Sequence, residues 1–326
     1  MKREIRSYIV SAIFVAFLAT LLLGGRAAEA GGSSLASDQD VQSLGSSDNS
    51  EQHAAAEKLM KGSKDSIPVL LNGLGSSSQQ VKTKALWILR QIRMQVKSLN
   101  DDSIATELGK KGRTENDPKL RRDMMLALGE LRGAKASGEL KRFASEDSDD
   151  EVRRIATRRV AQVSPSKETQ FFKKQASDVN VQVRLAAFIE LAQMGDMSGR
   201  DLALKTVSGS VQIDERAAAF ELLGYAGNPD DAALLKSASE SATENYHSRY
   251  FALRAYRHNL LLQLSSKDRL NFLIKSLDDP SEGVRDCAFL DLYHSPDPNT
   301  NARLKKYLGE KGHIGYSEAA HTLGSS

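Results

Sequence analysis

One pattern of residues recurs along this chain of 326 residues and constrains its fold more than any other feature. A basic residue, preceded by Val in four of seven copies, returns at spacings of 31 to 39 residues. Repetition at this period indicates an array of stacked units in place of one globular core. Taken as position zero of each copy, the basic residue is Lys82, Arg121, Arg153, Arg184, Arg216, Arg249 or Arg285.

Apolar residues follow position zero at the third, fourth and seventh places of the copies, with Thr157 at a fourth place as the exception. These offsets lie on one face of an α-helix, so we expect every copy to begin with a helix buried along this stripe. Phe188, Phe220 and Phe289 at the fourth place are assigned to core packing and not to an aromatic ligand channel. The third place is the most uniform, with Ala85, Met124, Ala156, Ala187, Ala219, Ala252 and Ala288.

Capping residues mark the start of each predicted helix. Six of the seven residues four places before zero are good N-caps, whose side-chain oxygen can accept from the free N–H groups of the first turn. An eighth, weaker copy has Asn49 as its cap and His53 at zero. The seven positions are Ser78, Asp117, Asp149, Asn180, Gln212, Asn245 and Ser281.

A second apolar-periodic segment follows each first helix after a turn. Pro68, Pro165 and Pro229 stand at or just before the starts of these segments, where a missing N–H is tolerated. Two antiparallel helices per period predict an all-α protein, an α-solenoid of seven to eight helix pairs. We expect this array to cover residues 46–326, with 314–326 as a capping segment.

Segments such as "DPKLRRDMMLALGEL", "DDEVRRIATRRVAQV" and "DPSEGVRDCAFLDLY" resemble the HEAT repeat, in its short bacterial phycobilisome-lyase form. The resemblance covers about residues 46–313 and implies an armadillo-type superhelix. It further implies a non-enzymatic scaffold that binds a protein or peptide on a concave face lined by the second helices. A minority of such proteins are lyases or enzyme accessories acting on small molecules, and no active-site residue carries over from them.

The first 30 residues have the pattern of a secretory signal. Lys2, Arg3 and Arg6 precede an apolar run at 8–24, and Ala28-Glu29-Ala30 is a small-residue cleavage site. We therefore expect export to the periplasm or the extracellular space, with an uncleaved membrane-tethering anchor as the alternative. Residues 31–45 are predicted as a flexible Gly/Ser/Asp-rich linker, or at most a frayed half-repeat around Val41 to Leu44.

Composition argues against several classes of function. The 45 basic and 42 acidic residues nearly balance, so no field for nucleic acid is expected. Cys287 is the single cysteine and is predicted to be a buried apolar residue. The six histidines lack metal-ligand spacing, and no catalytic fingerprint is present. We expect no enzymatic activity, no cofactor and no metal, a monomeric chain, and no membrane insertion after signal cleavage.

The zero-position arginines are predicted to form a structural ladder with acids at the helix starts. In this interpretation Asp117, Asp149 and Asp178 pair with arginines of the same or a neighbouring repeat. The alternative is a row of anion-binding groups. The predicted ladder residues are Arg121, Arg153, Arg184, Arg216, Arg249 and Arg285 with Asp117 and Asp149.

Two sets of residues are candidates for partner binding. The first lies on the second helices of adjacent repeats, where basic doublets could bind an acidic partner or an anionic surface, or could be solvated helix faces. The second is an aromatic cluster in the seventh repeat, favoured at protein interfaces. The candidates are Lys141, Arg142, Phe171, Lys173, Lys174, Tyr246 and Tyr250.

Overall fold

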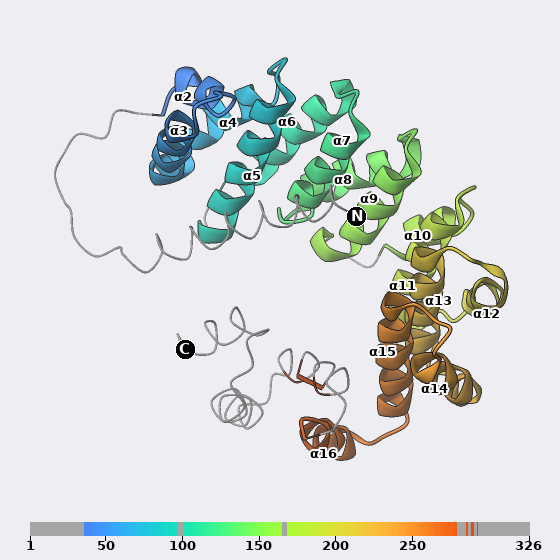
Figure 1. Cartoon of the computed structure of the whole chain (residues 1–326). Coiled ribbons are helices and arrows are strands. Elements are labelled where there is room, and N and C mark those ends of the chain that lie inside the picture. The colour runs from blue at the N-terminus through green and yellow to red at the C-terminus, as the bar shows by residue number, and fades with distance from the viewer. Residues whose placement is uncertain are drawn as a thin grey trace.

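The computed structural model of the chain describes residues 36–96, 99, 101–164 and 168–278, together with 285, 288, 289 and 292. Every element within these residues is helical, and Figure 1 shows the helices stacked in pairs along an arc from α2 to α16. The predicted all-α solenoid is therefore confirmed. No helix in this part of the chain is long and apolar enough to cross a membrane. The predicted signal sequence and capping segment lie outside the described residues.

The first helices of the six repeats from α5 to α15 begin directly after their predicted caps, while the seventh predicted cap, Ser281, lies outside the described residues. Ser78, Asp117, Asp149, Asn180 and Asn245 each accept a hydrogen bond from an N–H of the first turn, as predicted. Gln212 makes no such bond, and the weak first copy is capped by Asp48 in place of Asn49. The first helices are α3 (Asn49–Gly62), α5 (Gln79–Gln95), α7 (Pro118–Leu128), α9 (Asp150–Val163), α11 (Val181–Gln193), α13 (Ile213–Ala226) and α15 (Tyr246–Leu262).

The second helices return antiparallel to the first. Pro68 lies in the first turn of α4, and Pro229 begins a short 3-10 turn, η2 (Pro229–Asp231), before α14. Another 3-10 turn, η1 (Ser63–Ser66), precedes α4. The second helices are α4 (Ile67–Gly73), α6 (Asp101–Thr114), α8 (Ala134–Glu146), α10 (Thr169–Gln175), α12 (Arg200–Gly209), α14 (Ala232–Glu240) and α16 (Ser266–Ser276).

The core follows the stripe predicted from the repeat. All seven residues at the third place, from Ala85 to Ala288, have 0% of their surface exposed. At the fourth place Phe220 and Phe289 are buried, while Phe188 is half-buried and packs against two neighbouring parts of the core. Small residues at the third place let adjacent repeats approach closely, and the larger ones fill the space between them.

Residues 38–43 of the predicted linker form a helix, α2 (Asp38–Ser43). Ser37 caps it, and Val41 and Leu44 are buried against α3, α4 and α5. The linker prediction therefore fails for these residues, because two apolar side chains one turn apart are enough to anchor a short helix to the end of the stack. The half-repeat alternative describes this segment.

The zero-position side chains join each repeat to the next. Arg121 donates from Nη1 to the Glu115 carbonyl at 3.0 Å and from Nε and Nη2 to Asp147 at 2.8 and 2.8 Å. Arg153 bonds in the same way to the Asp147 carbonyl at 3.0 Å and to Asp178 at 2.9 and 3.1 Å. Each of these carboxylates belongs to the following repeat. We call this series of contacts the basic ladder, which also contains the pairs Lys82–Glu115 and Arg216–Glu244.

Asp178 pairs with Arg153 as predicted, but Asp117 and Asp149 do not pair with a zero-position arginine. Asp117 and Asp149 serve as caps, and Asp149 also pairs with Arg122, which does not stand at position zero. The ladder carboxylate usually stands two residues before the cap, as Asp147 does. Its oxygens face the preceding repeat and also accept from the N–H of the cap residue, at 2.9 Å in the Asp147–Asp149 pair.

The first helices line the inner side of the arc between α9 and α15. Figure 1 shows α11, α13 and α15 on the inner side and α12 and α14 on the outer side. Neighbouring first helices pack along one another, and a Cβ at Gly224 of α13 would lie 2.7 Å from Cα of Ala255 of α15. This close approach draws the first helices together on the concave side. The implied arrangement, with second helices lining that side, is corrected for this region.

Candidate functional site: a concave groove on the first helices

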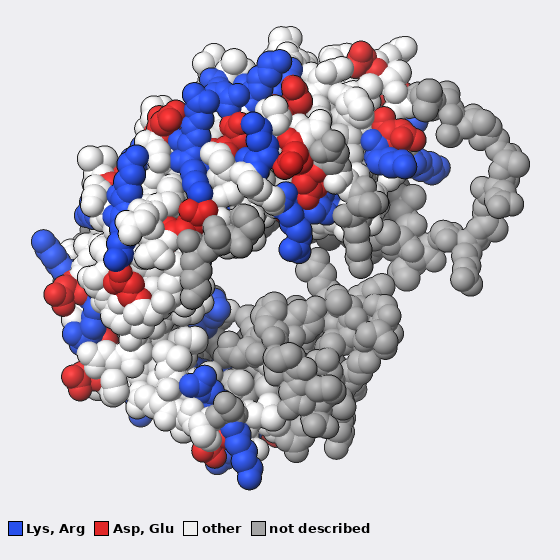
Figure 2. Space-filling view, turned by 180° about the vertical axis from the view of Figure 1, so that it is seen from behind, with Lys and Arg blue, Asp and Glu red and all other residues white. Residues whose placement is uncertain are grey.

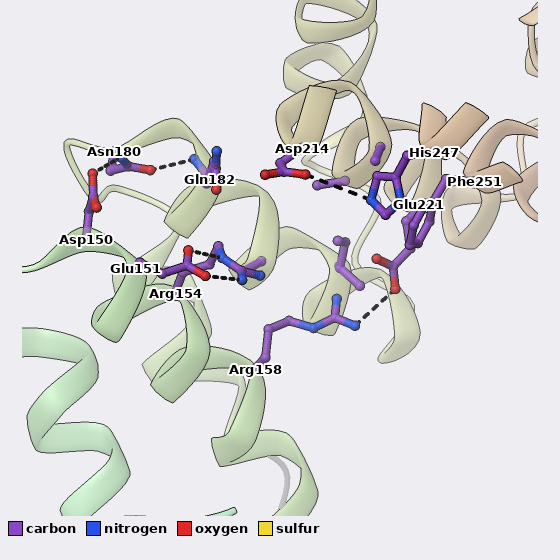
Figure 3. A pocket seen from close by; sticks show the side chains of 14 residues that line it. Asp150, Glu151, Arg154, Arg158, Asn180, Gln182, Asp214, Glu221, His247 and Phe251 are labelled. Atoms are coloured by element: carbon purple, nitrogen blue, oxygen red, sulfur yellow. Dashed lines mark hydrogen bonds and ion pairs between the residues drawn. The ribbon is translucent and has the colours of Figure 1, made fainter. Parts of the chain in front are cut away.

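A groove crosses the first helices of four consecutive repeats. Its volume is about 480 Å³, within the range of about 300 to 1,000 Å³ of ligand sites. We call it the concave groove, and Figure 3 shows side chains from α9, α11, α13 and α15 converging on it. Its lining residues are Asp150, Glu151, Arg154, Arg158, Asn180, Gln182, Ala186, Ile189, Asp214, Ala217, Ala218, Glu221, His247 and Phe251.

The groove residues occupy fixed places in the repeat, beside the buried stripe. Two places before zero stand Glu151, Gln182, Asp214 and His247 of successive repeats, and five places after zero are further lining residues such as Arg158 and Glu221. These positions are not among the candidates predicted from the sequence, most of which lie on second helices. The sequence feature that could have identified them is the variation of residue type at the places two before and five after position zero, outside the buried stripe.

The floor of the groove holds an arginine between two carboxylates. Arg158 of α9 reaches Glu221 of α13 at 3.0 Å and Glu190 of α11 at 3.2 Å (Figure 3 shows the first contact). Glu190 is 6% exposed. Its burial raises its pKa to about 7, and Glu221 adds to the rise, while the charge of Arg158 opposes it. A single guanidinium thus links three repeats.

The rim of the groove carries further polar pairs. Arg154 forms a bidentate pair with Glu151 at 2.6 and 2.6 Å, which raises the pKa of the arginine. His247 lies 3.9 Å from Asp214, and its ring meets that of Phe251 edge to face at 4.9 Å.

Carboxylates outnumber guanidinium groups along the lining. Asp150, Glu151, Asp214 and Glu221 stand against Arg154 and Arg158, so the lining has an excess of two negative charges when His247 is neutral. The groove therefore presents an acidic surface to any ligand on the concave side.

A second cavity continues the groove toward α16. Its volume is about 380 Å³, and it shares Glu221 and Phe251 with the concave groove. Tyr225 and His258 line it with ring centroids 4.9 Å apart, and burial raises the pKa of the tyrosine. Because Leu261, Leu262 and Leu273 also contribute to its wall, this end is more apolar than the acidic end.

The basic candidates on second helices lie outside the groove. Lys141 pairs with Glu168 at 2.6 Å, Arg142 with Glu146 at 3.1 Å, and Lys173 with Asp196 at 3.5 Å. Lys174 is exposed, and Phe171 is half-buried with its ring 5.2 Å from that of Phe172. Figure 2 shows Lys and Arg interleaved with Asp and Glu on the face it presents. The paired acids reduce the field that these doublets offer an anionic surface.

The aromatic candidates adjoin the groove. Tyr246 is 77% exposed at the start of α15, next to His247. Tyr250 is half-buried, and its ring meets that of the groove residue Phe251 edge to face at 5.7 Å. Arg254 lies over both rings at 5.9 Å. This cluster is therefore placed to extend a contact surface from the groove to its rim.

No group of His, Cys, Asp and Glu among the described residues is arranged to hold a metal ion. Cys287, His294, His313 and His321 lie outside this part of the chain. Of the remaining ladder candidates, Arg249 is half-buried on α15 and Arg285 lies in a helical segment.

No protein-family model and no curated protein matches the chain. Solved helical proteins resemble it over most of its length. The Escherichia coli protein YibA is 15% identical, with 83% of this chain and 100% of that chain covered and a TM-score of 0.46. The complex of CpcE and CpcF of phycocyanin lyase from Nostoc is 19% identical, with 79% and 92% covered and a TM-score of 0.40. Human deoxyhypusine hydroxylase is 18% identical, with 78% and 94% covered and a TM-score of 0.33. At these identities and TM-scores the similarities assign neither an activity nor a partner to this chain.

Proposed function

We propose that this protein is a non-enzymatic scaffold that binds an extended segment of a partner protein in the concave groove. The observation that carries this proposal is the excess of carboxylates along a groove that crosses four first helices. Three helix-to-helix intervals of about 8 to 10 Å span about 24 to 30 Å. An extended strand rises about 3.3 Å per residue, so about eight residues fit this length.

The chemistry of the lining selects the kind of segment. Asp214 and Glu221 favour lysine or arginine side chains at the acidic end, since the rim carboxylate of Asp214 is 77% exposed and free to move toward a cation. Phe251, Tyr225 and Leu262 favour apolar side chains at the other end. The preferred partner segment is therefore one in which basic and apolar residues alternate, because alternate side chains of an extended strand point the same way.

A synthetic peptide tests this proposal directly. The probe is an acetylated, amidated and fluorescently labelled octapeptide of alternating Lys and Leu, with a Glu/Leu octapeptide as its counterpart. Fluorescence anisotropy with the full-length protein is expected to give saturable binding of the Lys/Leu peptide that weakens as salt rises. Equal binding of the two peptides would contradict the proposed selectivity.

Matched variants then locate the binding surface. Asp214→Asn with Glu221→Gln removes two groove carboxylates and should weaken binding about tenfold or more, which corresponds to about 1.4 kcal/mol. Glu57→Gln with Glu146→Gln changes the net charge equally, but these carboxylates form exposed pairs with Lys61 and Arg142 outside the groove. The control variant should bind like the unmodified protein. The same loss in both variants would mean that only net charge matters.

We also propose that the scaffold works outside the cytoplasm. The proposal is supported by the basic start, apolar run and Ala28-Glu29-Ala30 site of residues 1–30. Cell fractionation of a Gram-negative host with N-terminal sequencing is expected to find the chain in the periplasm, beginning at Gly31. A full-length chain in the membrane fraction would favour the anchor, and one in the cytoplasm would overturn the proposal.

A further inference from the structure

The basic ladder is interrupted between the repeats that begin with α11 and α13. Arg184 donates from Nη1 to the carbonyl groups of Asp178 and Val179 at 2.8 and 3.0 Å, as the intact members of the ladder do with their own loops. Its Nε and Nη2 have no hydrogen-bond partner among the described residues. The place that Asp147 and Asp178 occupy in their repeats is taken here by Ser210.

Ser210 makes only one of the two interactions that an aspartate makes at this place. It accepts from the N–H of the cap residue, but it provides no carboxylate for the arginine. Its hydroxyl accepts from the N–H of Gln212 at 3.1 Å, as Asp178 accepts from the N–H of Asn180 at 2.7 Å. The same hydroxyl donates to Glu215 at 2.5 Å. The turn is therefore preserved, but no carboxylate is supplied to the half-buried guanidinium of Arg184.

Exposed apolar side chains flank the interruption. Val179 and Val211 are 91% and 89% exposed, and each stands five places before the zero position of its repeat. The equivalent residues of the loops before α5, α7, α9 and α15 are polar, namely Ser77, Asn116, Ser148 and Glu244. Val179 and Val211 therefore stand in the two loops on either side of the one interrupted step of the ladder between α5 and α15, and both present apolar side chains that a partner can contact.

We propose that Arg184, Val179 and Val211 form a docking site for an aspartate or glutamate side chain of a partner protein, flanked by aliphatic residues. We call this site the open rung. The incoming carboxylate occupies the place that Asp178 holds on Arg153 and accepts from Nε and Nη2 together. Two exposed valines suit a carboxylate with aliphatic neighbours better than a heavily hydrated phosphate group.

The open rung does not rest on the proposed function of the concave groove. The two surfaces share no residue, and they select opposite charges. They lie close together, because the groove residue Asn180 directly follows Val179 and the groove residue Asp214 follows Val211 by three places. A partner can therefore contact both, but each surface is tested with its own probe.

The probe for the open rung is the peptide acetyl-Ser-Val-Asp-Val-Ser-amide, compared with the same peptide carrying Asn in place of Asp. The side-chain Nε–H resonance of Arg184 in nitrogen-15 spectra of the full chain reports contact. This resonance is assigned by its absence from the spectrum of the Arg184→Lys variant. We expect a saturable shift with the Asp peptide and binding at least fivefold weaker with the Asn peptide. Equal responses to both peptides would overturn the proposal.

Closing the rung within the chain provides the decisive variant. Ser210→Asp supplies the missing carboxylate, and Glu215→Gln in the same chain removes the repulsion that this aspartate would meet. This double variant should lose the response of Arg184 to the peptide. The control, Ser208→Asp with Glu215→Gln, has the same charge, but its aspartate lies on the exposed end of α12 and should leave binding unchanged. Equal binding by the two double variants would refute the open rung.

A third variant tests the apolar part and does not alter the ladder. Val179→Ser with Val211→Ser leaves every charge in place and should weaken the Asp peptide at least threefold, whereas unchanged affinity would exclude an apolar contact. Asp214→Asn with Glu221→Gln should not affect this peptide. Failure of the groove proposal and failure of the open rung are thereby distinguished.

Discussion

Arg153 and Asp178 tie two neighbouring repeats together through two hydrogen bonds of 2.9 and 3.1 Å, with only 12% and 11% of their side chains exposed. The pair raises the pKa of the arginine, while the guanidinium helps to hold the pKa of Asp178 below its usual value against the opposing effect of burial. The guanidinium also bonds to the Asp147 carbonyl of its own repeat, so the contact spans both sides of the repeat junction.

Disrupting the Arg153–Asp178 pair should lower the free energy of unfolding more than replacing Arg184 does. Arg153→Gln leaves Asp178 without its charged partner and should lower the free energy of unfolding by about 2 to 3 kcal/mol. Arg184→Gln loses bonds to backbone carbonyls only and should cost about 1 kcal/mol. Urea unfolding followed by circular dichroism measures both. Equal losses would mean that the carboxylate adds nothing to the ladder.

Glu190 should make stability fall between weakly acidic and neutral pH. Its pKa is about 7 in the folded protein against 4.5 for the free side chain. The neutral acid is favoured by folding, so its contribution is complete below pH 4.5 and is lost as the pH rises through 7. The difference of about 2.5 units corresponds to about 3 kcal/mol. Thermal unfolding of Glu190→Gln should lack this decline, and parallel pH profiles for the two proteins would contradict the expectation.

Gly224 should resist replacement although it lies within a helix. Alanine favours a helix over glycine by about 1 kcal/mol, but its Cβ would lie 2.7 Å from the backbone of Ala255, and such overpacking costs about 1 to 3 kcal/mol. Gly224→Ala should therefore destabilise the chain. Gly138→Ala on α8 is the matched control, since its Cβ meets nothing within 4 Å and should stabilise. Chemical denaturation compares the two, and a gain for both would show that α13 and α15 can separate freely.

Gln212 is a weak cap in an otherwise suitable backbone. Its φ and ψ are −78° and 124°, close to the −86° and 129° of Asn180, but its side chain caps nothing. Gln212→Asn should supply an acceptor for the first turn of α13 and raise the free energy of unfolding by about 1 kcal/mol. Gln212→Ala should change little, because no bond is lost. A gain in melting temperature for Asn alone is the expected result.

The buried stripe and the caps could be predicted because both depend on local chemistry. Ala187 is buried and Asn180 caps α11 as their places in the repeat require. The direction in which the array curves could not be predicted. Each helix of a pair buries an apolar stripe, and the sequence pattern does not say whether the first helices or the second helices lie closer together. That depends on side-chain size at single contacts, such as Gly224 against Ala255.

The ladder acids and the groove were harder to predict for a different reason. An acid at the cap and one two residues earlier look equally able to reach an arginine, but the oxygens of Asp149 already accept from the first turn and from Arg122. The groove depends on contacts across repeats, such as Arg158 with Glu221, which are 63 residues apart. No local pattern brings such pairs together.

The short helix α2 has a consequence for the solution behaviour of the whole array. The last repeat of a stack leaves one apolar face without a neighbour, and a further repeat can pack against that face. Val41 and Leu44 cover that face at the N-terminal side with barely two turns of helix. Because α2 covers this face, replacing Val41 and Leu44 with polar residues would expose an apolar surface on which a second copy can stack end to end.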